Sequence, residues 1–160
     1  MLYTSENIPY QEYRAIRELL GANSPEIERS LRAVIVFGEV VATGGSQDIN
    51  LLEVVDGWQG PRFVSYGSTE ALPLRGRLNL YFLTPEEFEQ PSLKTVQGQA
   101  WSSAQLLSRV RPAYAVLREK PSDYASTLMR RFDEMPIVEL ETQKGLDKDP
   151  LSFLQHQMAA

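Results

Sequence analysis

The stretch AVIVFGEVVATGGSQDINLLEVV, Ala33 to Val55, decides the fold of this 160-residue chain. Its first segment, residues 33–37, is apolar at every position and β-branched at three of them, which predicts a strand covered on both faces. After a glycine-rich break, the segment INLLEVV at residues 49–55 repeats this character. The stretch therefore predicts two buried strands of one sheet, joined by a short turn.

A third apolar run, LNLYFL at residues 78–83, predicts another strand. Thr84, Pro85 and Glu87 follow it directly. A hydroxyl at the N-cap, a proline at the first helical position and a glutamate three residues after the cap form a capping box. We therefore expect the third strand to run straight into a helix.

Two helices are expected before the first strand. The first has apolar side chains at helical spacing and ends at Gly21, a natural C-terminal cap; these side chains are Tyr13, Ile16 and Leu20. In SPEIERSL, Ser24 supplies an N-cap and Pro25 a first-turn proline, so a second, shorter helix begins there.

The chain becomes helical in character after residue 101. In SSAQLLSRVRPAYAVLRE the apolar stripe consists of Leu106, Val110, Ala113 and Leu117. Pro112 is expected to kink or divide this helix, and SDYASTLMRRFDEM predicts a further helix closed by Pro136. IVELETQKGLDKD fits either a late strand or an irregular crossing, and a last short helix is expected from Asp149.

Length and composition indicate one domain, residues 1–160. A hydrophobic fraction of 42% is enough for one well-buried core, and 160 residues are too few for two ordinary domains. We expect an α/β (α+β) fold, in which a small mixed sheet packs against helices and the C-terminal part, residues 102–160, is helical.

Composition also excludes several kinds of chemistry. The chain has no cysteine and a single histidine, His156, so disulfides, thiolate nucleophiles, Cys-ligated zinc and multi-histidine metal clusters are excluded. A net charge of -5 provides no overall basic field, so nucleic acid is not the expected partner. Neither a signal peptide nor a membrane span is evident, and we expect a soluble, cytoplasmic protein without membrane contact.

The order of these features resembles the nucleotidyltransferase superfamily, particularly its minimal, single-domain bacterial members. In that family a strand delivers a Gly-Ser pair to the start of a helix, a second strand begins with two carboxylates separated by one residue, and a third carboxylate lies on the next strand. Here VFGE, ATG, QDINLLEVV and RLNLYFLTPEEFE follow the same order. The resemblance covers residues 31–89.

The family arrangement has a physical reason. Residues i and i+2 of a strand point the same way, so two alternating acids can hold one hard cation. A third acid from a neighbouring strand completes a two-metal site, and backbone amides at the start of the helix hold phosphate. The resemblance thus implies a nucleotide ligand, magnesium if the site is active, and a separate helical partner protein.

This sequence departs from the family pattern at most of the matched positions. Asp48 remains as a metal ligand, but Asn50 stands where the second acid belongs and Asn79 where the third belongs. The nucleotide-binding positions are Gly38, Glu39, Asn50 and Asn79, and Glu39 brings negative charge where phosphate would approach. We therefore expect a catalytically degenerate, nucleotidyltransferase-like domain that acts as a binding or regulatory module.

Two alternatives stay open. The first is an active, magnesium-dependent nucleotidyltransferase with an unusual acid set, in which Glu39 and Asp48 are catalytic. Glu53 could join this set only with difficulty, because three positions beyond Asn50 it projects from the opposite strand face. The second alternative is an unrelated small α/β protein, in which Asp48 only caps the start of its strand.

Overall fold

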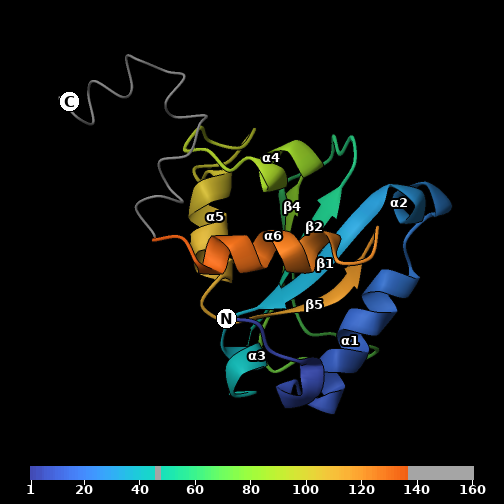
Figure 1. Cartoon of the computed structure of the whole chain (residues 1–160). Helices are drawn as coiled ribbons and strands as arrows, with labels where there is room; N and C mark the ends of the chain where they lie inside the picture. Colours follow the sequence, from blue (N-terminus) through green and yellow to red (C-terminus); the bar gives the residue numbers. More distant parts are fainter. Residues whose placement is uncertain (46–47, 137–160) are drawn as a thin grey trace.

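The computed structural model describes residues 1–45 and 48–136. Five strands form one sheet in the order β3-β4-β2-β1-β5 (Figure 1). Their bounds are β1 Leu31–Phe37, β2 Ile49–Val55, β3 Phe63–Tyr66, β4 Leu78–Leu83 and β5 Tyr114–Glu119. β2 and β4 pair in parallel, whereas β1 pairs antiparallel with both β2 and β5, and β3 pairs antiparallel with β4. The sheet is therefore mixed.

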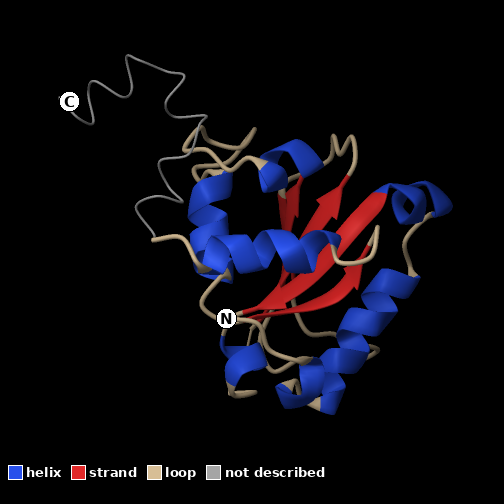
Figure 2. Ribbon diagram, viewed as in Figure 1, coloured by secondary structure: helices blue, strands red, loops and turns tan. Residues whose placement is uncertain are grey.

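Helices cover both faces of this sheet (Figure 2). The short η1 Ser5–Asn7, α1 Tyr10–Gly21 and α3 Glu39–Ala42 contribute to one side, and α2 Pro25–Ser30 leads into β1. The other side carries α4 Pro85–Glu89, α5 Ser103–Val110 and α6 Tyr124–Asp133. The expected fold class, a mixed sheet with packed helices, is confirmed.

β1 shows how the central strands create two cores. Ala33, Ile35 and Phe37 join the core beneath α5 and α6. Val34 and Val36 point the other way and join the core beneath α1. Because successive side chains of a strand face opposite sides, a continuous apolar run is what burial on both faces requires. The three predicted strands are adjacent in one sheet.

The predicted helix starts are confirmed by their capping bonds. Ser24 Oγ accepts a hydrogen bond from the Ile27 amide at 3.3 Å at the start of α2. Thr84 and Glu87 form the expected capping box at the start of α4, directly after β4. The helix predicted in residues 122–135 is α6, and α1 ends at Gly21 as expected.

The C-terminal part of the fold differs from the expectation at one segment. α5 ends at Val110, Ala113 lies outside any helix, and Leu117 belongs to β5, so the predicted stripe through these residues is wrong beyond Val110. Pro112 lacks an amide donor and prevents the helix from continuing. The following residues pair with the open edge of β1, which satisfies backbone groups that a helix would leave unpaired.

β3 was not predicted, because its four residues are half-buried or exposed and carry no apolar run. The ambiguous segment after Pro136 and the helix predicted from Asp149 lie outside the described residues. Within the described ranges, no helix combines the length and the apolar character that crossing a membrane demands.

Candidate functional site

The turn that follows β1 sits at the position matched to the Gly-Ser pair. Gly38 has φ 96° and ψ -162°, a conformation that side-chain-bearing residues rarely adopt. A Cβ atom at this position would lie 3.3 Å from Asn50 Nδ2, so the backbone passes close to the Asn50 amide. Asn50 is also the register partner of Phe37. Gly38 and Asn50 are thus neighbours in space.

Glu39 opens α3 and its side chain is exposed. Its carbonyl oxygen accepts hydrogen bonds from the amides of Thr43 and Gly44 at 2.9 and 3.2 Å. No hydrogen bond or ion pair within residues 1–45 and 48–136 engages its carboxylate. With only four residues, α3 is little more than one turn, and its first residue carries a negative charge that would repel phosphate.

Asp48 makes a local structural bond. Its Oδ1 accepts a hydrogen bond from the Arg77 amide at 2.9 Å, immediately before β4 begins. The residues that follow Asp48 and Arg77, Ile49 and Leu78, are the first register partners of the β2–β4 pair. Asp48 therefore fixes the start of the parallel pairing, which is the role expected of an aspartate that caps a strand.

Asn50 and Asn79 lie side by side on β2 and β4. They are register partners, and Asn79 Nδ2 donates a hydrogen bond to Asn50 Oδ1 at 3.1 Å. Ser65 Oγ on β3 donates to Asn79 Oδ1 at 2.7 Å, and Arg77 Nε donates to Ser65 Oγ at 2.7 Å. We call these four residues, Asn50, Asn79, Ser65 and Arg77, the amide row.

The hydrogen-bond acceptors of the amide row are paired with donors of the row itself. Each acceptor oxygen that faces a neighbour receives a donor, and the single charge in the row is the positive guanidinium of Arg77. In the part of the chain that the structure describes, no group of three or more His, Cys, Asp or Glu residues could hold a metal ion. The row therefore has the chemistry of a hydrogen-bonded strand junction.

Glu53 lies on the opposite face of β2, as its odd spacing from Asn50 predicts. The side chain is buried at 3% exposure among the residues beneath α1, and its neighbours in the row across the sheet are Val34 and Arg118. Burial raises the pKa of the Glu53 carboxyl to about 7; Arg118 opposes this shift and Glu28 adds to it. Glu53 cannot share a cation with Asp48 and Glu39.

Arg75 and Glu12 join the same end of the sheet to α1. Arg75 Nε lies 3.3 Å from Glu12 Oε2, and its Nη2 donates to the Gly44 carbonyl at 3.0 Å. Gly44 has φ 74°, and a Cβ there would come within 2.5 Å of the Asn7 carbonyl oxygen. These contacts make Gly44 a required turn residue, and its amide donates to the carbonyl oxygens of Glu39 and Val40 at 3.2 Å each.

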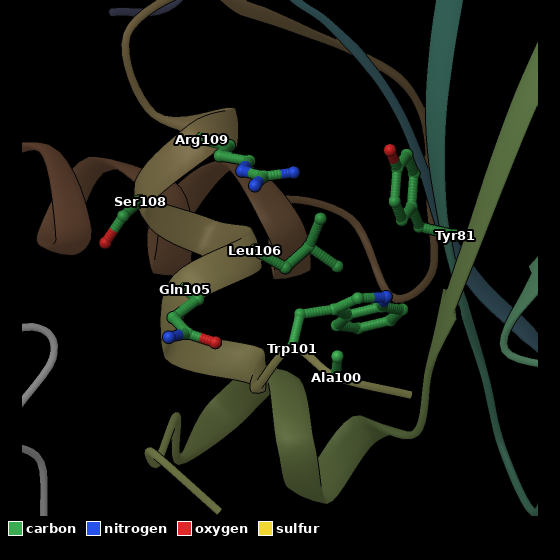
Figure 3. A pocket seen from close by; sticks show the side chains of 7 residues that line it. All are labelled: Tyr81, Ala100, Trp101, Gln105, Leu106, Ser108 and Arg109. Carbon is green, nitrogen blue, oxygen red and sulfur yellow. The ribbon is translucent and has the colours of Figure 1, made fainter. Parts of the chain in front are cut away.

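A cavity adjoins the amide row on the same sheet face. It is lined by Tyr81 on β4, two residues beyond Asn79, and by Trp101 and the α5 residues Leu106 and Arg109 (Figure 3). None of Tyr81, Trp101 and Arg109 was placed in a site from the sequence. Tyr81 lies two positions after Asn79, and residues i and i+2 of a strand share a face. This spacing could have shown that the cavity and the amide row lie on the same face of the sheet.

The structure thus brings Gly38, Asn50 and Asn79 together, sets Asp48 beside them in a structural bond, and leaves the Glu39 carboxylate exposed without a protein partner in the described chain. The residues that sequence reasoning missed are Ser65 and Arg77, which complete the amide row. Comparisons with protein-family models, with curated proteins and with solved structures found no match to this chain.

Proposed function

We propose that this chain is a nucleotidyltransferase-like domain that does not transfer nucleotides and acts as a binding or regulatory module. The strand arrangement supports the proposal. β1 leads through the Gly38 turn into β2, which is antiparallel to it, and β4 then lies parallel to β2 on the other side. This arrangement brings the matched positions to one end of three adjacent strands.

The hydrogen bond between Asn50 and Asn79 is the observation that carries the proposal. Two carboxylates at this distance would repel one another until a divalent cation came between them. Two amides instead pair directly, with the NH₂ group of Asn79 toward the oxygen of Asn50. Because the two amides are already hydrogen-bonded to each other, this pair gains little from binding magnesium.

The charges around the row favour the same conclusion. Arg77 places a guanidinium at the end of the row, where it would compete with a cation, and Asp48 is held by the Arg77 amide. A pair of divalent ions needs several protein carboxylates to hold it. Asp48 is the only carboxylate at the matched acid positions, so the site lacks the charge for two-metal chemistry.

The direct test combines binding and transfer. Calorimetric titration of the purified chain with ATP in excess magnesium should give no saturable heat, and incubation with each labelled nucleoside triphosphate should leave no label on the protein. Asp48→Ala should behave like the unaltered chain in both assays. Transfer by the unaltered chain that disappears in Asp48→Ala would overturn the proposal and favour an active site built on Glu39 and Asp48.

A nucleotide ligand and a separate helical partner are part of this proposal only as what the resemblance implies. The nucleotide is tested by the same titration repeated in EDTA. The partner is tested by purifying a tagged form of the chain from the cells that make it and measuring the mass of the purified particle. A mass equal to that of the chain alone would remove the partner from the proposal.

A further inference from the structure

A cavity of about 360 Å³ lies between Tyr81 of β4 and the side of α5 that carries Leu106 and Arg109, with Trp101 just before that helix. Figure 3 shows Tyr81 on one wall, and Trp101, Leu106 and Arg109 on the side of α5 that faces it. Its volume lies in the range of small-molecule sites in proteins. No residue of the amide row lines this cavity. On β4 the hydrogen bonds of the row end at Asn79, two residues before Tyr81.

The wall formed by Tyr81 is rigid and aromatic. Its ring centroid lies 4.9 Å from that of Phe63 on β3 and 5.7 Å from that of Phe37 on β1, both in tilted contacts. The Trp101 ring meets it edge-on at 5.7 Å. These separations are those of favourable aromatic pairs, so the three neighbours hold the Tyr81 ring in place. A bound ring would find a preformed surface.

The opposite wall supplies one positive charge. Arg109 is exposed in the last turn of α5, and no carboxylate within residues 1–45 and 48–136 pairs with it. The Tyr81 hydroxyl has no hydrogen-bond partner in these ranges either. In Figure 3 the Arg109 guanidinium and the Tyr81 hydroxyl lie toward the same end of the cavity, with the Trp101 indole toward the other.

We propose that this cavity binds a small planar ring that carries one anionic group. The ring lies against the Trp101 indole and Leu106, and the anionic group accepts hydrogen bonds from Arg109 and the Tyr81 hydroxyl. One cation matches one anionic group; a triphosphate would bring more negative charge than a single arginine compensates on a chain of net charge -5. The inference stands on the cavity and goes beyond the proposed function.

A carboxylate and a phosphate ester share the chemistry that Arg109 recognises, so the test uses one probe of each kind. Benzoate and phenyl phosphate carry the same ring with different anions. For probes of this size we expect a dissociation constant on the order of 1 mM, because few atoms contribute. Tighter binding of benzoate would identify a carboxylate ligand, and tighter binding of phenyl phosphate would identify a phosphate ester.

Binding is measured at the two tryptophans of the chain, Trp58 and Trp101. Incorporation of 5-fluorotryptophan gives one ¹⁹F signal for each, and the variant Trp58→Phe assigns them. Titration with benzoate or phenyl phosphate should shift the Trp101 signal saturably and leave the Trp58 signal in place. Benzamide lacks the charge and cyclohexanecarboxylate lacks the planar ring, so each should shift Trp101 much less.

Matched variants connect the shift to the cavity. Arg109→Gln should raise the dissociation constant of benzoate about tenfold, since it removes a charge-assisted hydrogen bond. Arg29→Gln, at an exposed arginine of α2 with only a 4.0 Å contact to Glu26, should leave it unchanged. Both variants change surface side chains, and a thermal melt of each confirms that the fold is retained.

The proposal is overturned if neither anion shifts the Trp101 signal up to about 10 mM, well above the expected constant. It is equally overturned if benzamide binds as tightly as benzoate, or if Arg109→Gln and Arg29→Gln weaken binding alike. All titrations contain EDTA, so their result is independent of any metal at Asp48. Nucleotide transfer would contradict the proposed function and leave this site standing.

Discussion

Asn79 on β4 donates a hydrogen bond of 3.1 Å to Asn50 on β2, and the two residues are register partners across parallel strands. The bond replaces the cation that two acids at these positions would need. It also depends on the neutrality of both amides, because two carboxylates so close would repel each other. The charge of these two side chains therefore decides whether they form a strand junction or a metal site.

Changing Asn50 and Asn79 together to Asp should turn the pair into a cation site. In EDTA the double variant should be less stable than the unaltered chain by about 1–3 kcal/mol, through like-charge repulsion and the lost amide bond. Manganese or magnesium should restore stability, since an ion that binds only the folded state stabilises it. Thermal melts with and without the metal measure both effects.

The charge-matched control for this pair is Gln11→Glu with Gln59→Glu, at two exposed positions. It adds the same net charge and should show no metal-dependent change of the melting temperature. If the control and the Asp pair respond equally to manganese, the match of Asn50 and Asn79 to the acids of the resemblance is wrong.

In the same Asp-substituted background, Glu39→Ser should improve nucleotide binding. The exposed carboxylate at the first residue of α3 repels phosphate, and its removal lowers that cost. We expect a lower dissociation constant for ATP in excess manganese, measured by calorimetry. Glu6→Ser, at another exposed glutamate, is the control and should change nothing. An unchanged constant for Glu39→Ser would place the phosphate path elsewhere.

The central fold was predictable because burial on both faces leaves an unambiguous pattern. Residues 33–37 are apolar without interruption, and residues 49–55 are apolar except at Asn50 and Glu53; the two segments form β1 and β2. The segment that became β5 was not predictable in the same way, since its apolar residues fit a helical stripe as well as a strand. The open edge of β1, a tertiary feature, decided between them.

The candidate site was predictable only in part. The face shared by Asn50 and Asn79 followed from strand alternation and from pairing of β2 with β4. Ser65 and Arg77 could not be added, because their contacts depend on β3, a short strand with little apolar pattern. The cavity required the packing of α5 against Tyr81, which no local pattern encodes.

Gly38→Ala should destabilise the chain by about 1–3 kcal/mol, because alanine at φ 96° is strained and its Cβ would press on Asn50 Nδ2 at 3.3 Å. Gly21→Ala is the control: no atom lies within 4 Å of a Cβ placed there. Urea unfolding compares the two. Equal losses would show that the Gly38 turn relaxes and does not constrain Asn50.

Glu53→Gln should remove a pH dependence from the stability of the fold. Burial raises the pKa of the folded Glu53 carboxyl from 4.5 to about 7, so between these values the folded state holds a proton that the unfolded state has released. The free energy of unfolding must therefore fall as pH rises from 4.5, and it levels off above pH 7. A shift of this size corresponds to at most roughly 3 kcal/mol.

Glutamine resembles the protonated acid and does not titrate, so the variant should match the unaltered chain near pH 5 and exceed it in stability near pH 8. The other charges that face this position are Arg118 of β5 and Glu28 of α2, which form an ion pair at 2.9 Å, and both remain in the variant. Glu70→Gln, at an exposed loop position, is the control and should keep the original slope. Urea unfolding at intervals between about pH 5 and 8 measures the curves. Parallel curves for Glu53→Gln and the unaltered chain would mean that Glu53 is ionised in the fold and is held by Arg118.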